Sequence, residues 1–344
     1  MAVRLKDIAR DLGVSVVTVS KVLRDHRDIS ADTRERVRRR MRELNYRPNL
    51  TARALVTGRT YSVGVIVPDL VHPFFSEVAK GLSRVLRAKS YSLVISSSEE
   101  DPELEKSEIE QMLARRVDAL VIASTQWTVE SFRRIEEQRT PYVLIDRRFA
   151  GLAANFVGVD DERLGELAAE HLIERGCRQI AHIRGPEVST ALGRLEGFRR
   201  ALSRRGAMVP NSYIVEGESS DDAGDASGYR AMRKLLRLAP RPDGVFCYND
   251  PIAMGALKAI LEAGLRVPDD IAVMGCGNVH YSGLLRVPLT SIDQDSRGIG
   301  ERAAKLALSL VEAGGAPVRP ATILLRPRLV PRESTARRKE NGRQ

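Results

Sequence analysis

The sequence predicts an α/β protein, in which an all-α helix-turn-helix headpiece at the amino terminus precedes a two-lobed core of doubly wound parallel sheets. Apolar residues recur at helical spacing between residues 5 and 45. From residue 61 to residue 330, short β-type runs alternate with helical stretches, which is typical of parallel strands joined by right-handed crossovers. Each half of this region begins with a strand, a polar loop and a long helix, and this pseudo-repeat favours two open sheets over one barrel.

The composition of this 344-residue chain is that of an ordinary globular protein, with 43% hydrophobic and 29% charged residues. Its start, MAVRLKDIARDL, is too polar for a secretory signal, and no apolar run approaches the roughly 18 residues that span a membrane. Cys177, Cys247 and Cys276 never occur in CxxC spacing, which indicates free buried thiols in a reducing compartment. We therefore expect a cytoplasmic protein with no membrane partner.

The net charge of +10 is distributed unevenly along the chain. Residues 1–60 hold 15 Lys and Arg against 7 Asp and Glu, or +8, and the tail at 331–344 carries +3. The stretch between them carries −1. A small basic module on a nearly neutral body suits a polyanion such as nucleic acid. Charge alone leaves open the alternative of a solvated basic surface.

The first two elements are expected to be helices, although the second is rich in residues with β propensity. Ile8, Ala9 and Leu12 share one helical face, and Gly13 ends that helix. Ser15 can cap a second helix. The buried stripe of this second helix is expected to comprise Val19, Val22 and Leu23.

Four residues of the second helix fall together on its opposite, exposed face: Val16, Val17, Ser20 and Lys21. Small side chains presented outward by the second of three short helices are typical of a DNA-reading helix-turn-helix. Val16 and Val17 can contact thymine methyl groups, while Ser20 and Lys21 can hydrogen-bond base edges or phosphates. The alternative is that these valines lie on an ordinary surface.

A third helix and a hinge follow. Ser30 can cap the third helix, which Asn45 and Pro48 end. The next segment, 49–60, can form only a short helix, which would be unstable alone in water. It is either a flexible linker or a helix that forms against DNA, with Leu55 as an apolar wedge between base pairs.

The core is expected to contain eight or more strands, among them 62–67, 91–96, 119–123, 142–146, 179–183, 213–217, 244–248 and 271–275. Helices are expected between them, at 77–88, 103–116, 163–175, 193–204 and 251–263. Two facing lobes form a cleft, with ligands at the carboxyl ends of the strands. The candidates are residues that follow strands: Asp69, His72, Phe74, Phe75, residues 124–127, Asp146, Arg147, Thr190, Arg194, Asn249, Asp250, Gln294 and Asp295. Each, taken alone, could instead be a cap or a salt-bridge partner.

Residues 3–69 carry a dense set of motifs, VRLKDIARDLGVSVVTVSKVL, ISADTRERV and LNYRPNLTARALVTGRTYSVGVIVPD. In these motifs the chain resembles the LacI/GalR family of bacterial transcription regulators. The likeness continues through HPFFSEVAKG, VLIDR, HLIERGCRQIAHIRGP, GRLEGFRRAL, SGYRAM, FCYNDPIAMGAL and VPLTSIDQD. It implies a repressor that binds a palindromic operator in double-stranded DNA as a homodimer. A small-molecule effector, a carbohydrate or another metabolite, would modulate it from the interlobe cleft.

The resemblance implies ten DNA-binding residues, which are Ser15, Val16, Val17, Thr18, Ser20, Lys21, Asn49, Ala52, Arg53 and Leu55. Val16, Val17 and Lys21 would read the operator. Leu55 matches the family's hinge leucine, which enters the minor groove at the operator centre. Lys21 replaces the arginine that most members carry, and lysine does not pair bidentately with guanine. The half-site sequence is therefore not taken from the family.

In the core, the resemblance implies a periplasmic-binding-protein-like fold whose chain crosses between the lobes three times. The expected divisions are a headpiece at 1–47, a hinge helix and linker at 48–60, a first lobe at 61–160 and 291–321, a second lobe at 161–290 and 322–331, and a disordered basic tail at 332–344. The implied effector contacts are Phe74, Phe75, Asp146, Arg194, Asn249 and Gln294. Arg194 would be a forked donor that clamps a hydroxyl pair or a carboxylate.

Two departures from the family bear on the ligand. After the strand at 271–275, the family usually has an aromatic residue and an aspartate, whereas this chain has Cys276 and Gly277. The segment 218–229 is longer than usual and lacks an aromatic residue that many members have. These changes disfavour a simple sugar and leave a ligand that needs fewer acceptors, a larger ligand or no ligand.

Motifs of enzymatic chemistry are missing from the sequence. The five histidines form no HExxH pattern, and no GxSxG, Walker or GxGxxG motif occurs. We therefore expect no catalysis, no metal and no cofactor. A small-molecule binding protein without a direct DNA role is the alternative, which the basic headpiece disfavours. The tail STARRKENGRQ has no leucine heptads, so no coiled coil is expected to extend the assembly beyond a dimer.

Overall fold

A computed structural model describes residues 3–23, 26–46, 54, 57–126, 128–149, 151–217, 224–316 and 319–337. The chain divides into two compact units, Met1–Thr60 and Tyr61–Gln344. Each unit has its own buried core.

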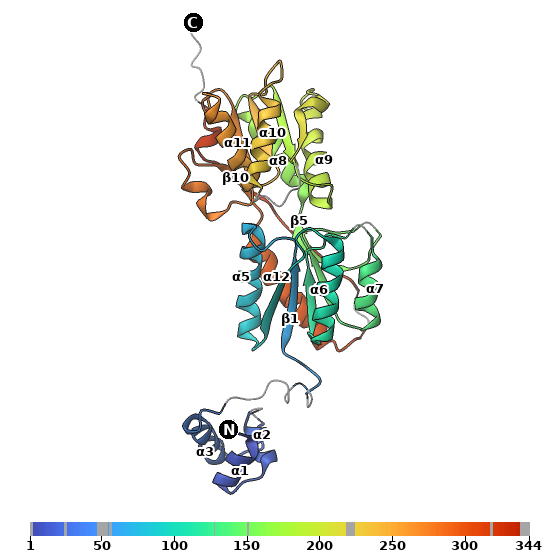
Figure 1. Cartoon of the computed structure of the whole chain (residues 1–344), viewed down its shortest axis with the longest axis vertical. Helices are drawn as coiled ribbons and strands as arrows, with labels where there is room; N and C mark the ends of the chain where they lie inside the picture. Colours follow the sequence, from blue (N-terminus) through green and yellow to red (C-terminus); the bar gives the residue numbers. More distant parts are fainter. Residues whose placement is uncertain are drawn as a thin grey trace. The chain divides into compact units, whose positions relative to one another are not determined.

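The first unit contains three helices, α1 (Leu5–Leu12), α2 (Val16–Leu23) and α3 (Ala31–Glu43) (Figure 1). Gly13 ends α1 in the left-handed conformation, with φ of 63°. Ser15 and Ser30 cap the two later helices, because their Oγ atoms accept the N–H of Thr18 (3.0 Å) and of Thr33 (3.3 Å). The shared core is formed by Ile8, Ala9, Val19, Val22 and Val37.

Leu23 differs from the expectation that it is buried. Val19 and Val22 are buried, but Leu23 is 38% exposed. Successive helical residues point about 100° apart, and Val22 already occupies the inward direction at the last turn of α2. The buried stripe of α2 is therefore narrower than its apolar sequence.

The second unit contains two six-stranded sheets. The first sheet is entirely parallel and has the order β11 (Thr322–Leu325), β5 (Asn155–Val159), β4 (Tyr142–Ile145), β3 (Ala119–Ile122), β1 (Ser62–Val67) and β2 (Ser92–Ser97). The second has the order β12 (Arg328–Val330), β10 (Thr290–Asp293), β9 (Ala272–Cys276), β8 (Gly244–Cys247), β6 (Ile180–Arg184) and β7 (Ile214–Glu216). Only the β10–β12 pair of the second sheet is antiparallel.

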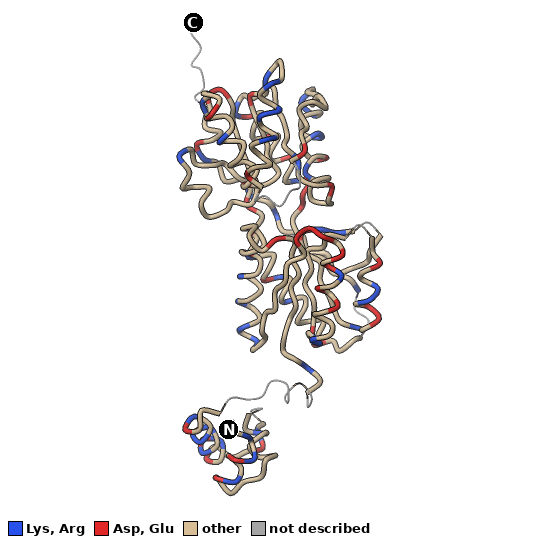
Figure 2. The backbone as a smooth tube through the Cα atoms, viewed as in Figure 1, with Lys and Arg blue, Asp and Glu red and all other residues tan. Residues whose placement is uncertain are grey.

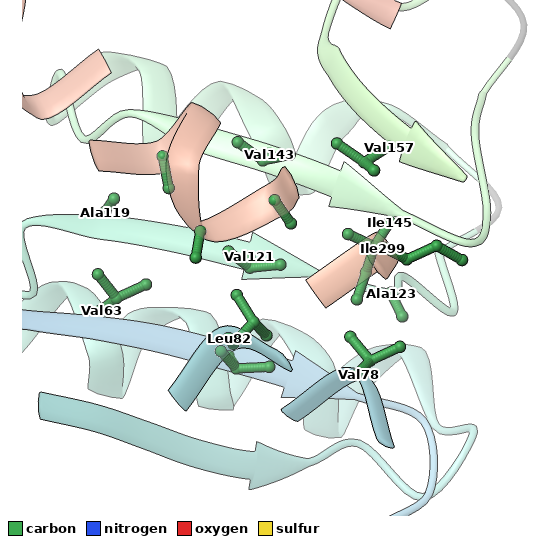
Figure 3. Close-up of a cluster of buried hydrophobic side chains, with 14 of the residues drawn as sticks. Val63, Val78, Leu82, Ala119, Val121, Ala123, Val143, Ile145, Val157 and Ile299 are labelled. Atoms are coloured by element: carbon green, nitrogen blue, oxygen red, sulfur yellow. The ribbon is translucent and has the colours of Figure 1, made fainter. Parts of the chain in front are cut away.

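Helices cover both faces of each sheet, which gives the doubly wound arrangement. On the first sheet, α5 (Pro73–Ala88) and α12 (Ser296–Glu312) share one face, and α6 (Pro102–Ala114) and α7 (Glu130–Glu137) share the other. On the second, α8 (Asp161–Glu174) and α9 (Ser189–Ser203) oppose α10 (Asp225–Leu235) and α11 (Asp250–Glu262). Figure 3 shows the first of these interfaces, where Val78, Leu82 and Ile299 meet the sheet.

The boundaries between the lobes differ from those expected. Residues 291–293 belong to β10 of the second sheet and not to the first lobe, while residues 322–325 form β11 of the first sheet and not part of the second lobe. The chain passes between the sheets after β5, between β10 and α12, and between β11 and β12. Pairing between strands distant in sequence sets these crossings, and local patterns do not report it.

The expectation of a disordered tail from residue 332 is wrong for its first six residues. A short 3₁₀ helix, Glu333–Thr335, buries Ser334 and Thr335 against the second lobe. Ser334 Oγ accepts the N–H of Thr290 (2.8 Å), and the Arg337 guanidinium donates to the backbone oxygens of Pro268 and Asp243. Backbone and side-chain hydrogen bonds hold a segment that its composition marks as solvated.

Gly81 is expected to tolerate no side chain, because α5 and α12 pack with their backbones in contact. A Cβ atom at Gly81 would lie 2.2 Å from the carbonyl oxygen of Arg297. Gly81→Ala should therefore lower the free energy of unfolding of the core by about 1–3 kcal/mol, measured by urea denaturation. Lys80→Ala, at an exposed position of the same helix, is the matched control, and equal stability of the two variants would contradict this packing.

Candidate functional site

The outer surface of α2 is the first candidate site. Val16 is 45% exposed and Val17 62% exposed, whereas Val19 and Val22 lie in the core. Thr18, Ser20 and Lys21 are partly buried. Ser15 is engaged as the cap of α2, and its Oγ also lies 2.8 Å from Thr18 Oγ1. Of the residues expected to bind DNA, five thus lie on α2 and a sixth, Ser15, caps it.

Lys21 is paired within the headpiece. Its ammonium group donates to Asp28, and this hydrogen bond lowers the pKa of the Asp28 carboxyl. A base or a phosphate that approaches Lys21 therefore competes with Asp28 for its ammonium group. Residues Asn49, Ala52, Arg53 and Leu55, also expected to bind DNA, lie outside the described residues.

The arginines of α3 make the headpiece basic (Figure 2), and some of them also hold its helices together. Arg40 pairs with Asp11 of α1 (2.6 Å) and with Glu43 (3.1 Å). Arg36 donates to the carbonyl oxygen of Leu12 at the end of α1 (3.3 Å). These arginines thus tie α3 to α1 in addition to carrying positive charge.

A cavity of about 160 Å³ between the two lobes is the second candidate site. Loops from the carboxyl ends of strands in both sheets line it, as parallel α/β sheets favour. All six residues expected to contact an effector line this cavity: Phe74, Phe75, Asp146, Arg194, Asn249 and Gln294. Glu100 and Tyr248, which the sequence did not single out, line it too. Tyr248 directly follows β8, a position that could have identified it.

Arg194 is buried and forms hydrogen bonds through all three of its nitrogen atoms. It donates to Asp161 (2.9 Å), to the backbone oxygen of Tyr248 (2.7 Å) and to Gln294 Oε1 (2.9 Å). Its guanidinium also stacks on the Tyr248 ring, 4.5 Å from the ring centroid. Burial raises the pKa of Asp161, and the positive charge of Arg194 opposes that shift. Two of the five N–H groups of Arg194 are left for a ligand.

Asp146 presents an unsatisfied carboxylate to the cavity. Arg147 pairs bidentately with Glu100 (2.8 and 2.6 Å), so that its nearest approach to Asp146 is 3.8 Å. Within the described part of the chain, no hydrogen bond reaches the Asp146 side chain, and burial raises its pKa. Its backbone has φ of 60°, a left-handed conformation that occurs more often at functional sites than elsewhere. Asp146 is therefore an acceptor available to ligand N–H or O–H groups.

Asp250, in contrast, is a structural residue. Its carboxylate accepts from Val279 N (2.8 Å), Ser282 Oγ (3.0 Å) and Ser291 Oγ (2.6 Å). Cys276 lines the cavity as a neutral thiol, because burial raises its pKa to about 12. Gly277 has φ of 124°, which favours glycine at this position.

Within the described ranges, no group of three or more His, Cys, Asp or Glu side chains could hold a metal ion. Over the same ranges, every helix is too short or too polar to cross a lipid bilayer. The arrangement of the cavity favours binding of a small polar molecule with aromatic walls at Phe74 and Phe75.

Family models match both parts of the chain. The model for bacterial regulatory proteins of the lacI family matches residues 4–49, and the model for a periplasmic binding protein-like domain matches residues 169–335. The HTH-type transcriptional repressor PurR of Klebsiella pneumoniae is 34% identical over 335 residues, covering 96% of each chain. PurR of Actinobacillus pleuropneumoniae is 32% identical over 332 residues, covering 96% of this chain and 97% of that protein.

Solved structures with a similar fold include DNA-bound and ligand-bound regulators. The lac repressor dimer bound to operator and the anti-inducer ONPF has a TM-score of 0.85 and 31% identity, covering 97% of this chain and 99% of that one. The transcriptional regulator CelR in complex with cellobiose has a TM-score of 0.73 and 29% identity, covering 96% and 99%.

Asp146 and Asp250 are expected to respond in opposite directions to the same substitution. Asp146→Asn removes a buried charge without hydrogen bonds and should raise the melting temperature of the ligand-free protein. Asp250→Asn replaces one accepting oxygen by an amide nitrogen, which then faces either Ser291 Oγ or the pair Val279 N and Ser282 Oγ, and should cost about 1–3 kcal/mol. Calorimetry of both variants tests this, and a lower melting temperature for Asp146→Asn would show that its carboxylate is satisfied.

Proposed function

Because this chain belongs to the lacI family of bacterial regulatory proteins, we propose that it represses transcription as a homodimer on a palindromic operator, controlled by a small molecule in the interlobe cavity. The chain is a DNA-binding transcriptional regulator, and it acts by binding in the cytoplasm rather than by catalysis. The observation that carries this function is the surface of α2, where Val16 and Val17 are exposed on a helix held by the buried Val19 and Val22.

Each DNA contact follows from the chemistry of these side chains. Val16 and Val17 meet thymine methyl groups in the major groove, and Lys21 donates to a base edge or a phosphate. Thr18 and Ser20 contact phosphates, which set the register of the helix. In the hinge, the DNA backbone is contacted by Asn49, Ala52 and Arg53, and Leu55 inserts into the minor groove.

The cavity controls DNA binding through coupled equilibria. A ligand that offers hydrogen-bond donors to Asp146 and acceptors to Arg194 favours one angle between the lobes. That angle sets the separation of the two hinges in the dimer, and ordered hinges bind the operator. The effector is a metabolite recognised by hydrogen bonds and aromatic contacts, and the change of operator affinity on its addition identifies an inducer or a corepressor.

Operator recognition is tested by gel shift on DNA from the region upstream of the protein's own gene. The combined substitution Val16→Ala, Val17→Ala and Lys21→Ala should reduce discrimination between cognate and scrambled duplexes at least about tenfold, since each base pair that is no longer recognised costs about 1–3 kcal/mol. Lys305→Ala removes one positive charge from an exposed site on α12 and is the control. Absence of any specific complex with the wild-type protein would favour a ligand-binding protein without a DNA role.

Effector binding is tested by a thermal-shift screen of sugars, nucleosides and amino acids. Asp146→Asn should abolish the ligand-induced rise in melting temperature, because the amide keeps only one of the two accepting oxygens of the carboxylate. Asp269→Asn changes an exposed carboxylate outside the cavity lining and should preserve that rise. A ligand that stabilises Asp146→Asn as strongly as the wild type would rule out this cavity assignment.

A further inference from the structure

A hydrogen bond between His72 and Asn249 joins the two lobes at the cavity. His72 is the cap of α5 in the first lobe, and Asn249 is the cap of α11 in the second. His72 Nε2 lies 3.1 Å from Asn249 Nδ2. Both residues line the cavity, and a second contact between the lobes runs from Arg148 N to Ser189 Oγ (3.0 Å).

The orientation of the Asn249 amide is fixed by its role as a cap. Asn249 Oδ1 accepts the N–H of Ile252 (2.9 Å), so the amide nitrogen faces His72. An amide nitrogen only donates, and therefore His72 Nε2 must accept in this bond. The proton of the neutral imidazole then lies on Nδ1.

The other ring nitrogen faces a second donor. His72 Nδ1 lies 3.3 Å from the N–H of Phe74, which it caps at the first turn of α5. A neutral imidazole has one donor and one acceptor nitrogen, so it cannot accept at both places. Burial lowers the pKa of His72 to about 4, so the ring stays neutral near neutral pH. Only one of the two bonds can form at a time.

We propose that His72 is a tautomeric switch that couples closure of the lobes to the start of α5. In the closed state, Nε2 accepts from Asn249, and the N–H of Phe74 loses its cap. When the lobes separate, the proton moves through solvent to Nε2, and Nδ1 caps α5. This inference rests on the proposed function only in identifying lobe closure as the movement that an effector controls.

The switch would affect both the wall of the cavity and the core of the first lobe, because the first turn of α5 contributes to each. Phe74 and Phe75, the first turn after the cap, line the cavity and are also members of the buried cluster beneath the sheet. Further along α5, Gly81 contacts the backbone of α12. A change at the first turn of α5 therefore acts on both the ligand-binding side chains and the packing of α5.

Two substitutions at His72 test the two ring nitrogens independently, because each keeps an acceptor at only one of their positions. In His72→Asn, Oδ1 replaces Nδ1 and keeps the cap, but the side chain is too short to reach Asn249. In His72→Gln, Oε1 replaces Nε2 and keeps the bond between the lobes, but leaves α5 uncapped. We expect His72→Asn to shift the lobes toward the open state. We expect His72→Gln to shift them toward the closed state, because its open state no longer gains the cap on α5.

The separation of the lobes is measured by electron spin resonance on spin labels at Lys305→Cys in the first lobe and Met208→Cys in the second. The three native cysteines are buried, and the full-length labelled chain is diluted into unlabelled chain so that only distances within one protomer are read. Longer distances than the wild type in His72→Asn, together with a more closed distribution in His72→Gln, support the switch. Identical distributions in the two variants overturn it, provided that circular dichroism shows both to be folded.

The tautomer itself is read from ¹⁵N resonances of the histidine rings in the ligand-free protein, with His72 identified by its absence from the His72→Asn spectrum. We expect Nδ1–H in the wild type. Asn249→Asp keeps the cap on Ile252 but presents an oxygen to His72, so its spectrum should change to Nε2–H. The Nε2–H form in both proteins would overturn the proposal, whereas wild-type gel shifts, scored separately, would still support operator binding.

Discussion

Arg194 brings a positive charge into the interior of the second lobe, where water cannot solvate it, and the neighbouring structure is arranged around that charge. The guanidinium joins Asp161 at the start of α8, the backbone after β8 and Gln294 after β10. A buried charge without such partners would cost several kcal/mol, so these three segments are held in a fixed relation. The cavity wall of the second lobe is consequently preformed, and Arg194 is first a structural centre and then a ligand contact with two remaining N–H groups.

The first lobe offers the opposite arrangement. Glu100 takes up the charge of Arg147 and leaves the Asp146 carboxylate without a hydrogen bond from the described residues. One wall of the cavity is thus tied together by the hydrogen bonds of Arg194, while the other presents an open acceptor. A ligand that donates to Asp146 gains most when both walls approach it, and this asymmetry gives a physical reason for ligand-dependent closure.

Much of this architecture could be predicted from the sequence, because its signals are local. Helical spacing alone predicts that Val16 and Val17 lie on the exposed side of α2, and strand-following positions predict part of the cavity lining, although not Glu100 or Tyr248. The lobe boundaries and the order of residues 332–337 were not predicted, because they depend on partners distant in sequence. β10 pairs with β12, and Ser334 bonds to Thr290 across 44 residues. The contact of His72 with Asn249 spans 177 residues. No periodicity in a short window contains such information.

The two lobes are interleaved in the chain, and this has a consequence for synthesis on the ribosome. α12 and β11 come from residues 296–325, yet α12 supplies one side of the first lobe's core. The second sheet is likewise complete only when β12, at residues 328–330, has been synthesised. Neither lobe can bury its apolar surface until nearly all of the polypeptide has emerged, whereas the three headpiece helices bury theirs from the first 46 residues. On a nascent chain, the headpiece would therefore fold well before the domain that regulates it. The apolar segments of the lobes would stay exposed for longer, and these are the segments that chaperones would protect.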